Sequence, residues 1–158
     1  MTQEEANGLI EVLKRIKDPS TYAFPRPGIR ASNILQLISF FSKDLFLVDI
    51  KRSSTIDDQK YTLQMRYKKE NILLRLDCGS SKHGNPDGSI IECPHFHIFQ
   101  EGYGDKWAYP LPQVFSNPED LLTTLKEFLI YCHTTNISEL LLQDQQDIGG
   151  MLLEGNAP

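Results

Sequence analysis

Four short β-rich runs follow one another between residues 34 and 77, and they constrain the fold more than any other feature of the sequence. The runs read ILQLISF, LFLVDIK, KYTLQMRY and NILLRLD, at residues 34–40, 45–51, 60–67 and 71–77. Apolar and polar residues alternate along the third run, which is typical of a strand with one buried face. The polar breaks between runs have hairpin lengths. The sequence therefore predicts a mainly antiparallel sheet.

A helix is predicted before the first of these runs. Thr2 and Glu5 have the spacing of a capping box, in which the two residues satisfy each other's backbone amides. Apolar residues then recur at helical spacing, namely Ala6, Leu9, Ile10, Leu13 and Ile16. Proline disfavours helical backbone in the residue before it, so this helix is expected to end at Asp18.

A second helix is predicted to begin at Asn117. Asn117 to Asp120 combine a capping residue, a proline at the first helical position and acidic groups in the first turn. The fold class is thus α+β, with a four- to five-stranded mainly antiparallel sheet against which the N-terminal and C-terminal helices pack. We expect one domain over residues 1–148 and a mobile C-terminal tail at 149–158.

Composition favours a single cytoplasmic domain. The 158 residues are 40% hydrophobic, which is enough for one core. No apolar run reaches about 18 residues, and polar and acidic residues stand where a signal peptide would be basic and then apolar. The net charge of -5 argues against direct nucleic-acid binding, because that binding depends on a basic footprint.

Candidate metal ligands gather in residues 76–99, which hold two of the three cysteines and three of the four histidines. Thiolate and imidazole are the ligands that zinc prefers. The candidates are Cys78, His83, Cys93, His95 and His97. An odd cysteine count in a reducing compartment favours thiolate ligands over a disulfide framework. The sequence therefore predicts a zinc-binding hairpin in this stretch.

Two ligand sets remain open. On a strand, side chains two residues apart can converge on one ion, whereas those four apart start too far from each other. A closed structural site would use Cys78, His83, Cys93 and His95. An open site of the catalytic type would use His83, His95 and His97, with water in the fourth position.

Turn residues predict how the two groups of ligands meet. Asn85-Pro86 and Asp87-Gly88 are turn signals, so the segment at 90–99 should return antiparallel to the run at 71–77. Pro94 lacks an amide donor, which predicts that the returning strand lies at an edge or at a bulge. An edge position would keep the site near solvent.

A motif in the same region resembles a family of small bacterial and phage domains that has no assigned function. It consists of an RLD strand, a loop histidine before Asn-Pro, and P-H-x-H. The matching residues are Arg75, Leu76, Asp77, His83, Asn85, Pro86, Pro94, His95 and His97. The motif is more distantly similar to toxins of toxin–antitoxin modules. In its size, acidity and lack of Walker, GxSxG or HExxH motifs, the chain is similar in type to phage anti-CRISPR proteins.

These resemblances imply a function by binding. An anti-CRISPR-like protein would inhibit a bacterial defence nuclease through protein–protein interaction, so the expected partner is another protein or a nucleoprotein complex such as an RNA-guided nuclease, in the host-cell cytoplasm. The alternative is a toxin-like nuclease. There the three clustered histidines would bind metal or serve as acid and base, Asp77 would orient an imidazole and Arg75 would bind phosphate. The absence of a catalytic motif favours the binding protein over the enzyme.

Overall fold

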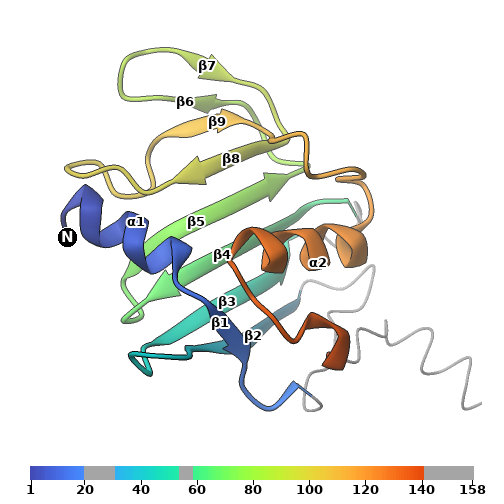
Figure 1. Ribbon diagram of the computed structural model, residues 1–158. Helices are drawn as coiled ribbons and strands as arrows, with labels where there is room; N and C mark the ends of the chain where they lie inside the picture. The colour runs from blue at the N-terminus through green and yellow to red at the C-terminus, as the bar shows by residue number, and fades with distance from the viewer. Residues whose placement is uncertain (20–30, 54–58, 141–158) are drawn as a thin grey trace, which may run out of the picture.

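A seven-stranded antiparallel sheet forms the centre of the computed structural model (Figure 1), which describes residues 1–19, 31–53 and 59–140. Its strand order is β1-β2-β3-β4-β5-β8-β9. The bounds are Lys14–Ile16 for β1, Ala31–Ser39 for β2, Leu45–Arg52 for β3, Tyr61–Tyr67 for β4, Asn71–Cys78 for β5, His95–Ile98 for β8 and Ala108–Pro110 for β9. Strands β6 (His83–Gly84) and β7 (Ile90–Ile91) form a separate two-stranded hairpin.

Two helices, α1 (Gln3–Glu11) and α2 (Leu121–Tyr131), lie in front of the sheet in the view of Figure 1. Their apolar side chains and those of the inward face of the sheet form one hydrophobic core. A short 3₁₀ helix, η2 (Ile137–Glu139), follows α2. Neither α-helix of the described residues is long and apolar enough to cross a membrane. The predicted α+β class and single domain are confirmed.

The predicted count of four to five strands was too low, partly because the first helix is shorter than expected. Helix α1 ends at Glu11, although its predicted capping box is present. Val12 is already extended, and the amide of Lys14 donates to the carbonyl of His133 at 2.9 Å. Lys14 and Ile16, both buried, then belong to strand β1. Helical spacing over residues 13–16 was therefore misleading, because pairing with β2 buries Ile16 in a strand, whereas Leu13 precedes the strand and is 45% exposed.

Helix α2 also begins later than the sequence predicted. Its cap is Asp120, whose carboxylate accepts from the amide of Thr123. The carbonyls of Asn117 and Pro118 accept hydrogen bonds from the side chains of Thr124 and Tyr61, which holds this segment outside the helix. The predicted domain end at residue 148 and the tail at 149–158 lie outside the described residues.

Strand β8 lies inside the sheet. Of the two positions that Pro94 predicted, an edge or a bulge, the edge is therefore wrong. The proline precedes the first residue of β8, so its missing amide removes no bond from the ladder. Strand β9 pairs with the far side of β8, with Ala108 opposite His97. The expectation of a site near solvent was therefore wrong for the histidines of β8, since His95 and His97 are buried.

The second face of the sheet carries the polar residues of the central strands. Because the register is regular there, one cross-strand row runs from β2 to β8 through Ile34, Asp49, Gln64, Arg75 and His97. At the β8 end of this row His83 from the β6–β7 hairpin packs its ring against the buried histidines. At the β2 end of the row Ile34 is exposed.

Candidate metal centre

The register between β5 and β8 creates the candidate site. Asp77 lies directly opposite His95, and Arg75 lies directly opposite His97. Directly paired residues point to the same face of a sheet and have close Cβ atoms. Two residues from each strand therefore meet on the face away from the helices.

Asp77, His95 and His97 bring one possible ligand atom each to within 4.8 Å of one another. The Oδ2 atom of Asp77 lies 3.3 Å from Nε2 of His95 and 3.2 Å from Nε2 of His97. His95 is 2% exposed and His97 is fully buried, while the Asp77 side chain is 13% exposed. This buried cluster could hold a metal ion.

The outer nitrogens of both histidines contact backbone carbonyls. Nδ1 of His97 lies 2.8 Å from the carbonyl oxygen of Asp105, and Nδ1 of His95 lies 3.3 Å from that of Glu92. A carbonyl oxygen only accepts, so each Nδ1 carries the proton and donates it. In a neutral ring Nε2 then carries a lone pair, and in an imidazolium it carries a second proton. Both Nε2 atoms and the carboxylate of Asp77 converge on one point, where a metal ion can lie between them.

Ligand orientation of this kind is typical of metal-binding histidines, which donate their second ring N–H to a carbonyl or carboxylate. The spacing also fits. Zn–N bonds of about 2.05 Å in a tetrahedron put neighbouring ligand atoms about 3.3 Å apart. The separations of the Asp77 oxygen from the two histidine nitrogens, 3.2 and 3.3 Å, are close to that value.

Arg75 supplies positive charge next to the cluster. Its Nε donates to Oδ2 of Asp77 at 3.1 Å, and its Nη1 forms an ion pair with the carboxylate of Asp105. Nη2 lies 3.0 Å from Nε2 of His97. The guanidinium therefore partly neutralises the lone pairs that a metal ion would bind.

The protonation of the cluster follows from burial and from these contacts. Burial alone would raise the pKa of Asp77, but the contact with His97 and the charge of Arg75 outweigh it and hold that pKa well below its ordinary value. Burial lowers the pKa of His95 against the opposing influence of Asp77. Near pH 7 the site therefore holds an ionised carboxylate and a neutral His95, which are the forms that bind metals.

His83 borders the cluster without belonging to the group of three. It comes from β6, and its ring centroid lies 4.7 Å from that of His97 and 5.7 Å from that of His95. Its Nε2 donates to the carbonyl of Lys106 at 2.6 Å, which leaves Nδ1 as an acceptor. His83 is thus a neighbour of the cluster, and it is not one of the three residues that could hold a metal ion together.

The two candidate cysteines lie elsewhere. Cys78 is the last residue of β5 and points to the opposite face from Asp77, into the hydrophobic core. Burial raises the pKa of its thiol to about 11, which disfavours the thiolate. The thiol of Cys93 donates to the backbone carbonyl of Asp77 at 3.4 Å, and Cys93 is not one of the three residues that could hold a metal ion. The structure therefore does not bring Cys78 together with the histidines.

Residues outside the five sequence candidates complete the site. Asp77 was expected only to orient an imidazole, and it is the carboxylate that joins the two histidines. Thr62 on β4 and Asp105 in the loop before β9 support Asp77 and Arg75. Alternation along β5 predicted the face on which Asp77 lies. No sequence pattern predicted Asp105, because it lies in a turn and meets Arg75, which is distant in the sequence.

Comparison with known proteins adds a family but no function. A family model described as a family of unknown function, DUF6978, matches residues 1–134. No curated protein and no solved structure matches the chain. The match confirms the resemblance to a small domain of unassigned function. The phage origin stays a prediction.

Proposed function

The chain belongs to the DUF6978 family of unknown function, and on the chemistry of its site we propose that it is a zinc-binding protein that acts by binding another macromolecule. The zinc ligands are Asp77, His95 and His97, with His83 or water in the fourth position. The metal joins β5 to β8 beneath the β6–β7 hairpin.

The observation that carries the proposal is the convergence of acceptors. One carboxylate oxygen of Asp77 lies 3.2 and 3.3 Å from the Nε2 atoms of two imidazoles, which is the separation of neighbouring ligands in a tetrahedral zinc site, and each ring is oriented by a backbone carbonyl. Imidazole with carboxylate suits zinc, although other divalent transition metals accept the same ligands. Zinc is preferred because a four-coordinate site needs only one more donor.

Burial supports a structural role for the metal. Both zinc-binding nitrogens belong to rings that are at most 2% exposed, so a substrate would reach them only after the covering hairpin moved. Arg75, the residue expected to bind phosphate in a nuclease, pairs with Asp77 and Asp105. Two carboxylates offset its charge, which weakens its attraction for a phosphate. The binding protein is therefore favoured over the nuclease.

Elemental analysis of the purified full chain tests the metal. We expect about one zinc per chain after dialysis, and a melting temperature that falls when a chelator removes it, because metal binding contributes folding free energy. A chain that neither retains nor takes up zinc, and whose melting temperature is the same in chelator, would contradict the proposal.

The RNA-guided nuclease stays a predicted partner. A DNA-cleavage assay by such a nuclease, with and without an excess of the purified chain, tests it directly. Unchanged cleavage across a panel of these enzymes would remove this partner class and leave the metal site intact as a separate proposal.

A further inference from the structure

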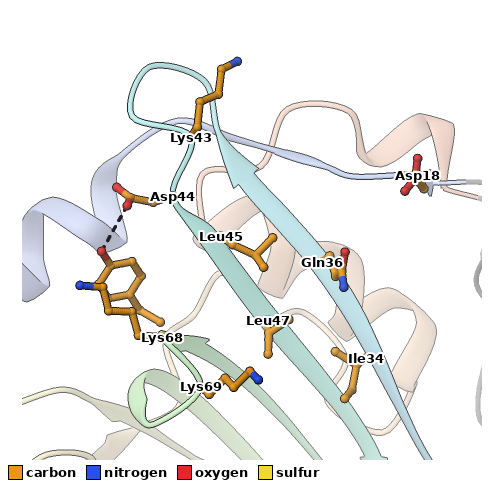
Figure 2. Close-up of a pocket in the computed structure, with 10 residues that line it drawn as sticks. Asp18, Ile34, Gln36, Lys43, Asp44, Leu45, Leu47, Lys68 and Lys69 are labelled. Atoms are coloured by element: carbon orange, nitrogen blue, oxygen red, sulfur yellow. Dashed lines mark hydrogen bonds between the residues drawn. The ribbon is translucent and has the colours of Figure 1, made fainter.

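An apolar groove opens on the second face of the sheet, at the β2 and β3 end (Figure 2). Its volume is about 690 Å³. Its floor comes from Ile34 on β2 and from Leu45 and Leu47 on β3, and Ile34 and Leu45 are 47% and 44% exposed. The residues that line the rest of it are Asp18, Gln36, Lys43, Asp44, Tyr67, Lys68 and Lys69. Exposed aliphatic side chains grouped in this way are typical of a binding surface.

The rim of the groove collects positive charge. Lys43 comes from the β2–β3 turn, and Lys68 and Lys69 come from the β4–β5 turn, so two turns place three lysines at one end. In the described part of the chain the ammonium groups of Lys43 and Lys69 have no hydrogen bond or ion pair, and that of Lys68 lies over the ring of Tyr67. The chain as a whole has a net charge of -5, so this rim is a local exception.

The two acidic residues of the groove offset this charge only in part, because three lysines line it against two aspartates. Asp44 accepts hydrogen bonds from the hydroxyls of Ser42 and Tyr67. Asp18 lies across the groove from Lys68 and Lys69, as Figure 2 shows. The groove therefore has a basic end and an apolar floor.

Backbone strain is concentrated at the same place. Five non-glycine residues of the described chain have positive φ angles, and four of them line the groove: Asp18, Lys43, Lys68 and Lys69, with φ of 53°, 59°, 51° and 64°. Glycine or asparagine would adopt this conformation at lower cost. Lysine at three strained turn positions around one groove indicates that the charge there has a use, since strain persists where function requires it.

We propose that this groove is a docking site for a segment of a partner protein that alternates acidic and apolar residues. Its leucine-like side chains lie over Ile34, Leu45 and Leu47, and its carboxylates lie next to Lys68 and Lys69. The inference deepens the proposed binding function by naming the chemistry of the partner. It is independent of zinc, because the groove and the metal centre share no residue.

Three synthetic probes of equal length test the chemistry on the full chain. They are twelve-residue peptides made of glutamate and leucine, of lysine and leucine, and of glutamate and serine. We expect the first to bind about tenfold more tightly than either of the others, with amide chemical-shift changes at residues 34, 45 and 47. Equal binding by the lysine–leucine or the glutamate–serine peptide, or shift changes confined to other surfaces, would overturn the proposal.

Variants of the rim and floor sharpen the test. Lys68→Glu combined with Lys69→Glu, and separately Leu45→Ser, should each weaken the glutamate–leucine peptide about tenfold, because one removes the charge and the other the apolar contact. The matched control, Lys82→Glu with Lys126→Glu, reverses two exposed lysines away from the groove and should leave binding unchanged. Equal weakening by the control pair would mean a general charge effect and would overturn the proposal.

Two other occupants are distinguished in the same experiments. If sedimentation showed a dimer that Lys68→Glu with Lys69→Glu dissociates, the occupant would be a second copy of this chain. If vesicles of phosphatidylglycerol bound the chain and the peptide did not, the occupant would be an anionic lipid surface. Either result would overturn the assignment to a peptide. Unchanged metal content in these variants would show that the failure does not extend to the proposed zinc site.

Discussion

Arg75 places Nη2 3.0 Å from Nε2 of His97, the same ring nitrogen that lies 3.2 Å from the carboxylate of Asp77. Because the Nδ1 proton of His97 is donated to the carbonyl of Asp105, Nε2 offers a single lone pair. A guanidinium and a metal ion therefore compete for it. Zinc binding requires Nη2 to withdraw, while the pair between Arg75 and Asp105 can persist.

Replacing Arg75 should strengthen metal binding. Arg75→Met removes both the competing donor and a positive charge beside the ion, so we expect zinc to bind about tenfold more tightly. Competition against a fluorescent chelator measures this affinity. The matched control is Arg66→Met, which breaks the pair with Asp49 elsewhere on the same face and should leave the affinity unchanged. An affinity for zinc that falls in Arg75→Met would show that the guanidinium supports the ligands instead of competing with the ion.

Substitution of the three ligands should abolish stoichiometric zinc. Asp77→Asn, His95→Gln and His97→Gln each remove one donor from a site of three protein ligands, and zinc content should fall from about one per chain to below about a tenth. Elemental analysis after dialysis provides the measurement. Cys93→Ser and His133→Gln serve as controls and should keep the metal, because neither residue belongs to the cluster.

The same series decides the fourth position. His83→Gln should weaken zinc about tenfold if His83 is the fourth ligand, and should change the visible spectrum of the Co²⁺-substituted protein. An unchanged spectrum would assign that position to water. Zinc that survived the changes at His95 and His97 but not at Cys93 would favour a thiolate site and would contradict the ligand set proposed above.

Buried Lys14 should make stability depend on alkaline pH. Its ammonium is fully buried and donates to the carbonyls of Ile10, Val12 and Cys132, and burial lowers its pKa from 10.5 to about 8. Between pH 8 and 10.5 the unfolded chain therefore binds more protons than the folded one, so stability rises with pH. The gain over this window is about 3 kcal/mol.

Urea unfolding of the wild type and of Lys14→Met at pH 7, 8, 9 and 10 measures this effect. The difference in the free energy of unfolding between the two proteins should grow in favour of the wild type as pH rises through this window. Lys17→Met, at an exposed position of the same segment, should give a difference that does not vary with pH. A constant difference for Lys14→Met as well would mean that the buried amine does not titrate in this range.

Asn85 should be essential for holding the β6–β7 hairpin on the sheet. Its side-chain amide donates to the carbonyl of Ala108 at 2.9 Å and accepts from the amide of Ala108 at 2.8 Å, so it acts as one more strand partner for β9. Asn85→Ala leaves both backbone groups without that partner and should cost about 2–4 kcal/mol of unfolding free energy. Denaturant unfolding measures it. Ser89→Ala removes a hydroxyl that hydrogen-bonds Asp87 and Asn85 at the exposed end of the loop, and should cost less than about 1 kcal/mol. Similar losses for both variants would contradict this role.

Local pattern was sufficient for the central strands and for the cap of the first helix. Alternation over residues 60–67 predicted β4, and the spacing of Thr2 and Glu5 predicted the cap of α1. Each of these features depends on residues that are neighbours in the chain. The helix predicted over residues 13–16 was wrong, because local spacing does not reveal that residues 14–16 pair with β2.

The chain's own order of residues thus determined that candidate metal ligands gather between residues 76 and 99, and that a sheet carries them. Only the tertiary structure decided which of them meet. Strand β5 extends one residue further than its pattern predicted, so Cys78 turns into the core, and the register with β8 sets Asp77 opposite His95. Strand pairing fixes such contacts through hydrogen bonds between segments distant in sequence, and a shift of one residue would move every ligand of a strand to the other face.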